Sequence, residues 1–202
     1  AVAGSLYDQD FIDRKDNFTS LSGEVRNMGS ITAGEVVMAG SSVANSGRIH
    51  APEGLVVMAA GPGSGVELSS RSGGVSVTVT PGGSGANSYA YGDLAGQALL
   101  LSGVVEASRV EAHAETIDVS GRVDASQVNL GNFRSVGQSA GSLSADTLTL
   151  AGSYSSESPP TVELTSSENG IGNLQASGNF ERLSVRSKGT LRVSQMSSES
   201  TT

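Results

Sequence analysis

The sequence of 202 residues has no cysteine, no tryptophan and an aromatic content of only 4%. Without cysteine the chain forms no disulfide, which leaves its redox compartment open and is compatible with a long exported chain that crosses membranes unfolded. No run of about 18 apolar residues occurs, so we expect no segment to span a bilayer.

Positive charge is scarce as well. The formal net charge is −8 and the isoelectric point is about 4.7. Because phosphate binding needs a clustered basic surface, this balance argues against nucleic acid as a partner. It argues equally against an anionic membrane surface, so we expect no membrane insertion.

Two common catalytic motifs are missing. The sequence contains no His-Glu-x-x-His and no phosphate-binding loop. The Gly-Pro-Gly-Ser-Gly stretch at residues 61–65 lacks the lysine and the following helix that phosphate binding requires. We therefore predict a non-enzymatic protein with no catalytic residue, no cofactor and no metal site.

Glycine, in contrast, is plentiful, with 27 residues against 5 prolines. Two near-copies of one unit follow each other in residues 27–61: Asn-Met-Gly-Ser-Ile-Thr-Ala and Asn-Ser-Gly-Arg-Ile-His-Ala, each succeeded by an aliphatic segment. The first part recurs after 18 residues and the aliphatic segment after 20. Two additional residues therefore lie between Ala51 and Val56, and we assign them to a turn at Pro52-Glu53, which accommodates an insertion better than a strand does.

The pattern Gly-x-aliphatic-x-small recurs farther along the chain. It begins at Gly29, Gly47, Gly103, Gly121, Gly141 and Gly172, with a weaker copy at Gly189. The steps between these glycines are 18, 56, 18, 20, 31 and 17 residues. Positions one, three and five of each copy share one face of a strand, and mostly polar residues lie between them. This alternation predicts half-buried strands, and its short period is typical of a solenoid.

A period of this length holds about three short strands. Stacked periods would pair each strand in parallel with its equivalent in the next, so we predict an all-β fold, a right-handed parallel β-helix. We expect glycine to supply positive-φ corners, and Asn27 and Asn45 to suit corners too. Paired leucines with helical spacing are absent, which excludes leucine-rich repeats, and propeller blades would be longer and richer in aromatics.

We predict a single domain over residues 1–202 with an uneven organisation. Its parts are an N-terminal lead-in or cap at 1–26, the first coils at 27–61, an extra-helical hairpin and loop at 62–97, further coils at 98–193, and a flexible tail at 194–202. The alternating valines and leucine of residues 66–68 and 75–79, joined by Ser-Arg-Ser-Gly-Gly, indicate the hairpin. In the lead-in, we expect Phe11 and Phe18 to cover the open end of the first coil.

Three groups of side chains are candidates for chemistry. Asp8, Asp10, Asp13 and Asp16 resemble a calcium loop, but the third aspartate is one residue late and the glycine and glutamate of such a loop are missing, so a solvated lead-in is the favoured interpretation. His50 occupies an outward position, for which solvent exposure is the favoured interpretation. Glu111, His113 and Glu115 share a strand face, where they form either a metal-binding row or a solvated one.

The alternative function is a carbohydrate-active β-helix enzyme of the polysaccharide lyase or hydrolase type. Such an enzyme needs paired carboxylates, or a metal with a basic residue, and aromatic platforms. The sequence offers Glu106, Glu111, Asp118 and Asp124, with Arg109 and Arg122 nearby, but no tryptophan. A third reading is a fibre subunit that self-associates end to end, because an open β-helix end is a templating edge.

Residues 10–80 carry a resemblance to a known family. The matching features are Asp10-Phe11, Asn17-Phe18, the Val-x-Asn-x-Gly-x-Ile-x-Ala unit at 25–33, the second Asn-x-Gly-x-Ile-x-Ala unit at 45–51 and the aliphatic-Ala-Ala-Gly close at 57–61. On these features the chain resembles the filamentous-haemagglutinin-type exoproteins, large adhesins that Gram-negative bacteria export by two-partner secretion. No Asn-Pro-Asn motif of the family's secretion segment occurs, which fits an internal or processed segment or a relative exported differently.

The resemblance implies a secreted or cell-surface β-helix that serves as an adhesin, stalk or fibre. Its implied partners are an outer-membrane secretion transporter during export and a protein or glycan on a host or neighbouring cell. Catalytic residues are not part of the family's shared pattern, so the resemblance implies none here.

Overall fold

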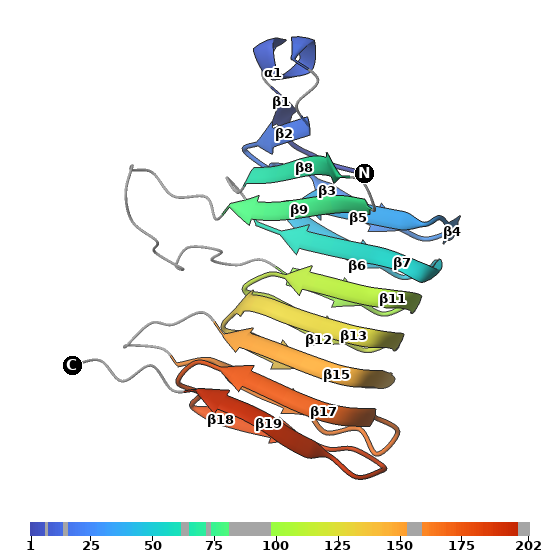
Figure 1. The fold of residues 1–202 in the computed structure, drawn as a ribbon, viewed down its shortest axis with the longest axis vertical. Coiled ribbons are helices and arrows are strands. Elements are labelled where there is room, and N and C mark those ends of the chain that lie inside the picture. Colours follow the sequence, from blue (N-terminus) through green and yellow to red (C-terminus); the bar gives the residue numbers. More distant parts are fainter. Residues whose placement is uncertain are drawn as a thin grey trace, which may run out of the picture.

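The computed structural model of the chain describes residues 1–6, 8–13, 16–61, 65–71, 74–80, 98–152 and 159–197. Within these residues almost all regular structure is β-strand, and the single helix, α1 (Asp8–Ile12), is one short turn and a half. Figure 1 shows two tall stacks of strands, one behind the other, with a small sheet and α1 at the N-terminal end. The predicted all-β class and parallel pairing are confirmed.

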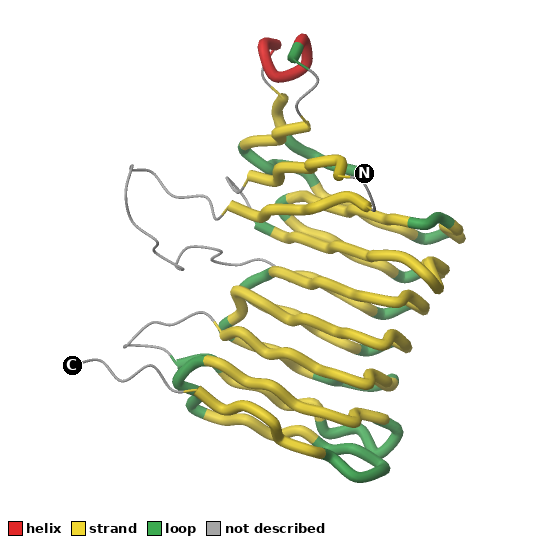
Figure 2. Tube along the Cα trace, viewed as in Figure 1, coloured by secondary structure: helices red, strands yellow, loops and turns green. Residues whose placement is uncertain are grey.

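Two parallel sheets make up most of the molecule, and the chain alternates between them. The seven-stranded sheet has the order β18 (Arg182–Val185), β16 (Thr161–Leu164), β14 (Ser135–Gly137), β12 (Thr116–Val119), β10 (Ala98–Leu101), β6 (Ser42–Asn45), β3 (Glu24–Asn27). The eight-stranded sheet has the order β19 (Arg192–Ser197), β17 (Gly170–Ser177), β15 (Ser142–Gly152), β13 (Arg122–Phe133), β11 (Val104–His113), β7 (Arg48–Ala60), β4 (Ser30–Thr32), and β5 (Glu35–Gly40) also pairs with β7. Apart from β4 and β5, which both pair with β7, consecutive strands of these two sheets belong to opposite sheets, and equivalent segments of successive repeats lie side by side (Figure 2).

The long strands of the eight-stranded sheet bend in the middle, as β7 shows. Its first half pairs with β4 and its second half with β5, which are separate strands. Opposite β11 the register shifts: Ala107 faces Ala51, but Arg109 faces Leu55. The two additional residues of this repeat therefore lie between Ala51 and Leu55, as the sequence predicted. The predicted turn at Pro52-Glu53 is wrong, because both residues lie within β7, and pairing continues on both sides of the bend.

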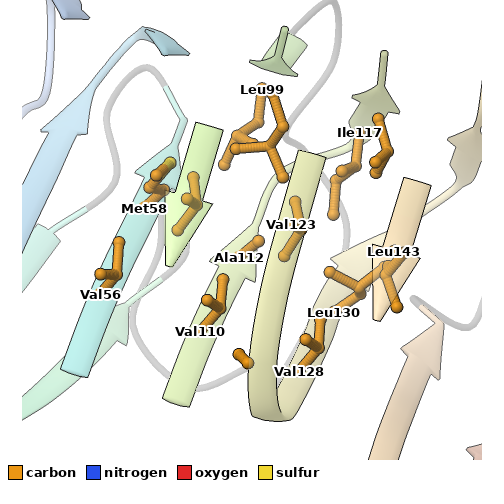
Figure 3. Close-up of a cluster of buried hydrophobic side chains, with 14 of the residues drawn as sticks. Val56, Met58, Leu99, Val110, Ala112, Ile117, Val123, Val128, Leu130 and Leu143 are labelled. Carbon is orange, nitrogen blue, oxygen red and sulfur yellow. The ribbon is translucent and has the colours of Figure 1, made fainter. Parts of the chain in front are cut away.

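The apolar core fills the space between the two sheets. Ile49, Val105, Val123 and Leu143 lie opposite one another on successive strands, and each is at most 1% exposed. Figure 3 shows side chains of both sheets meeting in this core, with Leu99 and Ile117 facing the long strands. Burial of each such side chain contributes about 1.5–3 kcal/mol, so the stack of aliphatic residues is the main source of stability.

The role predicted for glycine was wrong. Among the described glycines only Gly141 and Gly178 have a positive φ, so most do not form left-handed corners. They are needed because successive backbones approach closely. A Cβ atom on Gly47 would lie 2.0 Å from the carbonyl oxygen of Gly29, and one on Gly103 would lie 2.0 Å from that of Gly47. We call the stacked residues Gly29, Gly47, Gly103, Gly121 and Gly141 the glycine ladder.

The two asparagines expected at corners do end strands β3 and β6, but neither has the positive φ for which asparagine was expected there. Asn27 and Asn45 are buried, 8% and 0% exposed, in register on β3 and β6. The Asn27 side-chain amide donates to Asn45 Oδ1 at 2.8 Å, and Asn27 Oδ1 accepts from the Gly29 amide at 3.1 Å. These amides therefore satisfy one another and the backbone inside the stack.

A third sheet, which is antiparallel, joins the lead-in to the hairpin. Its order is β1 (Ser5–Leu6), β2 (Asp16–Thr19), β8 (Gly65–Arg71), β9 (Gly74–Thr80). The predicted hairpin is confirmed for β8 and β9, which pair antiparallel from Gly65–Thr80 to Arg71–Gly74. Its pairing with β2 was not predicted, since no local pattern connects segments so far apart in sequence. The predicted loop residues 81–97 lie outside the described residues.

The lead-in boundary at residue 26 needs correction. The parallel stack already begins with β3 at Glu24, and residues 1–3 join it, because Val2 pairs in parallel with Ala39. Leu21 is only 1% exposed and packs with Ala39. The side chain of Phe11 lies outside the described part of the chain, and Phe18 is half-buried on β2.

Two expectations near the C-terminus were wrong. The copy assigned to Gly172 is out of step, because Leu174 stacks on Leu148 in the second half of the long strand and not on Leu143. Both halves alternate with the same period of two, so a pattern alone does not distinguish them. The tail predicted from residue 194 begins within a strand, β19, which ends at Ser197.

Candidate functional site

Five ionisable side chains gather on the outward face of three neighbouring strands, β7, β11 and β13. We call Arg48, His50, Glu106, Arg122 and Asp124 the charged cluster. Parallel pairing places His50, Glu106 and Asp124 directly opposite one another, and Arg48 and Arg122 two residues before His50 and Asp124. The buried residues between them, such as Ile49 and Val105, anchor the strands in the core.

The contacts within the charged cluster are short. Glu106 Oε2 accepts from Arg48 Nη2 at 2.6 Å and lies 2.9 Å from His50 Nδ1. Arg122 Nη2 donates to Asp124 Oδ2 at 2.7 Å. His50 is therefore not simply solvated, as its outward position had suggested: its ring is 38% exposed and contacts a carboxylate of the next strand.

These pairs shift the proton affinities of the cluster. The hydrogen bond from His50, supported by the charge and hydrogen bond of Arg48, lowers the pKa of Glu106. The hydrogen bond and charge of Asp124 raise the pKa of Arg122. Both effects stabilise the charged forms. Two of the four carboxylates considered for an enzyme are thus each engaged by an arginine: the Arg48–Glu106 pair links β7 to β11, and the Arg122–Asp124 pair lies within β13.

Glu111 and Glu115 each form a separate pair with an arginine. Arg109 Nη2 lies 2.5 Å from Glu111 Oε1 on β11, and Arg134 Nε lies 3.3 Å from Glu115 Oε1. His113 lies between these pairs, half-buried. Within the described residues its Nδ1 atom is enclosed and has no hydrogen-bond partner. Burial lowers the pKa of His113, against a smaller opposing effect of Glu111.

His113 is large for its place in the stack. Its register partners on the neighbouring strands are Ala59 and Gly131. A Cβ atom on Gly131 would lie 2.7 Å from His113 Nδ1, so the imidazole ring occupies the space that the glycine leaves. This packing explains the buried nitrogen without a ligand.

One motif was not among the candidates above. Residues 137–141 read Gly-Gln-Ser-Ala-Gly, which has the spacing of a nucleophile elbow. Ser139, however, lies in the connection from β14 to the strand β15, where an elbow requires a helix. Its hydroxyl donates to Asp118 at 3.3 Å, and no described histidine contacts it. The pentapeptide therefore forms a corner of the stack.

The aspartates of the lead-in are not arranged as a calcium loop. Asp8 and Asp10 lie in α1, and Asp13 Oδ1 accepts from Gln9 at 2.9 Å. Asp10 Oδ2 lies 3.5 Å from the amide nitrogen of Asn17. Across the described ranges, no group of three or more His, Cys, Asp or Glu side chains is placed to hold a metal ion, including the row of Glu111, His113 and Glu115.

A further surface was missed by sequence reasoning. The second halves of β13, β15 and β17 present six uncharged polar side chains outward, which we call the polar grid. Its members are Gln127, Asn129, Thr147, Thr149, Asn173 and Gln175. The signal in the sequence was the alternation of amides and hydroxyls with buried aliphatic residues, but the parallel register that collects them was needed to see it.

Comparison of the chain with family models, with curated proteins and with solved structures gave no match. In the described part of the chain, no helix has the length and apolar character needed to cross a membrane.

Proposed function

We propose that the chain is a segment of a secreted or cell-surface exoprotein, built as a right-handed parallel β-helix, that acts as an adhesin, stalk or fibre and not as an enzyme. The observation that carries this proposal is the in-register stack of equivalent segments in two parallel sheets. Such a stack is long, rigid and repetitive, which suits a scaffold that holds a binding surface away from a cell.

The arrangement of the charged side chains supports a structural role. The arginines and carboxylates of the charged cluster form pairs between and along strands at 2.6 and 2.7 Å. Glu106 and Asp124 lie opposite one another on β11 and β13, where like charges weaken a sheet, and the arginine that each of them contacts offsets this repulsion. A catalytic carboxylate pair would instead need free oxygens beside a bound sugar.

The handedness and the route of export are parts of the same proposal. A crossover between parallel strands of one sheet is right-handed in almost all proteins, so we assign this hand to the stack. The Asn-x-Gly-x-Ile-x-Ala units at residues 27–33 and 45–51 support export by two-partner secretion, with an outer-membrane transporter as the partner. The net charge of −8 suits a protein that stays soluble outside a cell.

The experiment is an attachment assay with purified protein. Fluorescent microspheres coated with the chain should adhere to cultured cells more than microspheres coated with an unrelated acidic protein. A coating of Gly121→Ala protein, in which the added Cβ atom would lie 2.0 Å from the carbonyl oxygen of Gly103, should adhere less because the stack is disturbed. Equal adhesion of all three coatings to every cell type would refute an adhesive role.

A stalk or fibre without adhesive function is distinguished by its appearance. Electron micrographs of the purified chain should show discrete rods for an adhesin segment and continuous filaments for a self-associating fibre. Turnover of an acidic polysaccharide that is abolished by Asp124→Asn would instead assign an enzyme.

A further inference from the structure

The polar grid is a regular array. On β13, β15 and β17, Gln127, Thr147 and Asn173 are register partners, and Asn129, Thr149 and Gln175 form a second column. Neighbouring strands are about 4.8 Å apart, and alternate residues along a strand are about 6.6–6.8 Å apart. The six side chains therefore form two parallel columns with fixed spacing in both directions.

The hydrogen-bonding groups of the polar grid are available. Within the part of the chain that the structure describes, none of the six side chains has a hydrogen bond or an ion pair. The charged cluster on the first halves of β7, β11 and β13 is different, because each of its members contacts another member. The polar grid thus offers amide donors, amide acceptors and hydroxyls to a partner.

The grid is also rigid. Between its members lie Val128, Leu148 and Leu174 in one row and Leu130, Leu150 and Ala176 in the next, all at most 4% exposed. Because these residues are fixed in the core, the backbone beneath the grid is already in place before a ligand arrives. Preorganisation of this kind lowers the entropic cost of binding.

The chemistry of the grid selects the partner. The six side chains of the grid carry no charge. The next residues of its columns are Arg109 and Glu111 on β11, which pair with each other at 2.5 Å, and the exposed Arg192 on β19, which lies opposite Asn173. An anionic polymer would find one arginine at an edge of the grid and no cation inside it, and the net charge of −8 opposes its approach. A protein partner would need aromatic or aliphatic anchors, and the grid contains none. A neutral polysaccharide fits, because each of its sugar units carries several hydroxyl groups and the length of one unit is close to the spacing between strands.

We propose that the polar grid binds an extended neutral polysaccharide, whose chain runs along the two columns across β13, β15 and β17. The inference deepens the proposed function and rests on it, because the grid must be exposed outside the cell to reach such a polymer. Thr147 and Thr149 occupy the centre of the grid and contact the ligand from the middle strand.

The test uses the full chain and suspensions of cellulose and of chitin as neutral probes, with alginate as an anionic comparison. The variant Thr147→Val/Thr149→Val removes two hydroxyls while keeping the shape and the strand preference of the side chains. The matched control is Thr116→Val/Thr161→Val, which makes the same change on β12 and β16 of the other sheet. Circular dichroism checks that both variants keep the melting temperature of the wild type.

The expected result is retention of the wild type on cellulose or chitin, little retention on alginate, and no loss of retention at high salt, since no charge pairs are screened. Loss of two hydrogen bonds of ordinary strength should weaken binding by roughly tenfold or more in Thr147→Val/Thr149→Val, and the control should bind like the wild type. If the melting temperature of a valine variant drops, the separate substitutions Gln127→Ala and Asn173→Ala at the grid's edges serve instead.

Three results would overturn the inference: no retention on either neutral polymer, stronger retention on alginate, or equal effects of the grid variant and the control. Each can be separated from the proposed function. If coated microspheres adhere to cells while both neutral polymers fail to bind, the adhesive role stands and its partner is a protein or a charged glycan. If the polymers bind but microspheres do not adhere, the grid stands and the adhesive role fails.

Discussion

Replacement of one rung of the glycine ladder should destabilise the whole stack. A Cβ atom on Gly103 would lie 2.0 Å from the carbonyl oxygen of Gly47 and 2.8 Å from the carbonyl carbon of Ser46. Ordinary contacts begin near 3.4 Å, so the two backbones would have to separate by more than an ångström. That separation would strain the hydrogen bond from the Gly103 amide to the Asn45 carbonyl, which is 2.7 Å long. We expect Gly103→Ala to cost about 3 kcal/mol.

The same substitution at Gly29 is the control. Gly29 is the first residue of the glycine ladder, and a Cβ atom there would contact only the Asn27 side chain, at 4.0 Å. Gly29→Ala should change stability by at most about 0.5 kcal/mol, or raise it slightly through the unfolded chain. Thermal unfolding followed by circular dichroism should show a melting temperature lower by roughly 6–12 °C for Gly103→Ala alone. Equal shifts in the two variants would refute close approach as the reason for glycine.

Three other perturbations address the buried amides and the titrating groups. Asn45→Ala should lower the free energy of unfolding, measured in urea, by about 1–3 kcal/mol because Asn27 loses its hydrogen-bond partner. Asn45→Leu should lower it less, since Leu101 is the next residue of the same column. A larger loss for Asn45→Leu than for Asn45→Ala would contradict this reasoning. Burial lowers the pKa of His113 in the folded state, so the free energy of unfolding should fall as pH decreases below about 6.5. His113→Gln should remove this part of the pH dependence. Equal slopes of the unfolding free energy against pH in the variant and the wild type would contradict it. Because the pKa of Glu106 is lowered in the folded state, its carboxylate stabilises the fold at pH values above the unfolded pKa of about 4.3. This stabilisation is lost as pH falls through the folded pKa. Glu106→Gln should therefore weaken the pH dependence of the free energy of unfolding in that window.

The strands were predictable from the sequence because they follow from local alternation, and their parallel pairing was predictable because the unit recurs with a short period. The copies that begin at Gly103 and Gly121 were expected as strands, and the residues that follow these glycines lie in β11 and β13. The position of the insertion after Ala51 was predictable as well, since the two near-copies differ in length only there. These features need no knowledge of distant contacts.

Other features depend on which segments meet, and a pattern does not contain that information. The pairing of β2 with β8 joins residues near 17 and 67, whose sequences show no sign of each other. The burial of Asn27 and Asn45 follows from their stacking, whereas each alone looks like a turn residue. Of the candidate sites, the contact of His50 with Glu106 could be foreseen only with the register in hand.

The bend in the long strands has a consequence for how this architecture varies. From Ala51 to Leu55 strand β7 advances by four residues, whereas β11 advances by two from Ala107 to Arg109, yet the pairing stays in register on both sides. Length differences at that corner leave the columns of the core and the polar grid untouched. A foreign peptide of several residues inserted between Pro52 and Gly54 would accordingly be displayed along one edge of the stack. Homologous chains of unequal length would be expected to differ at this corner first.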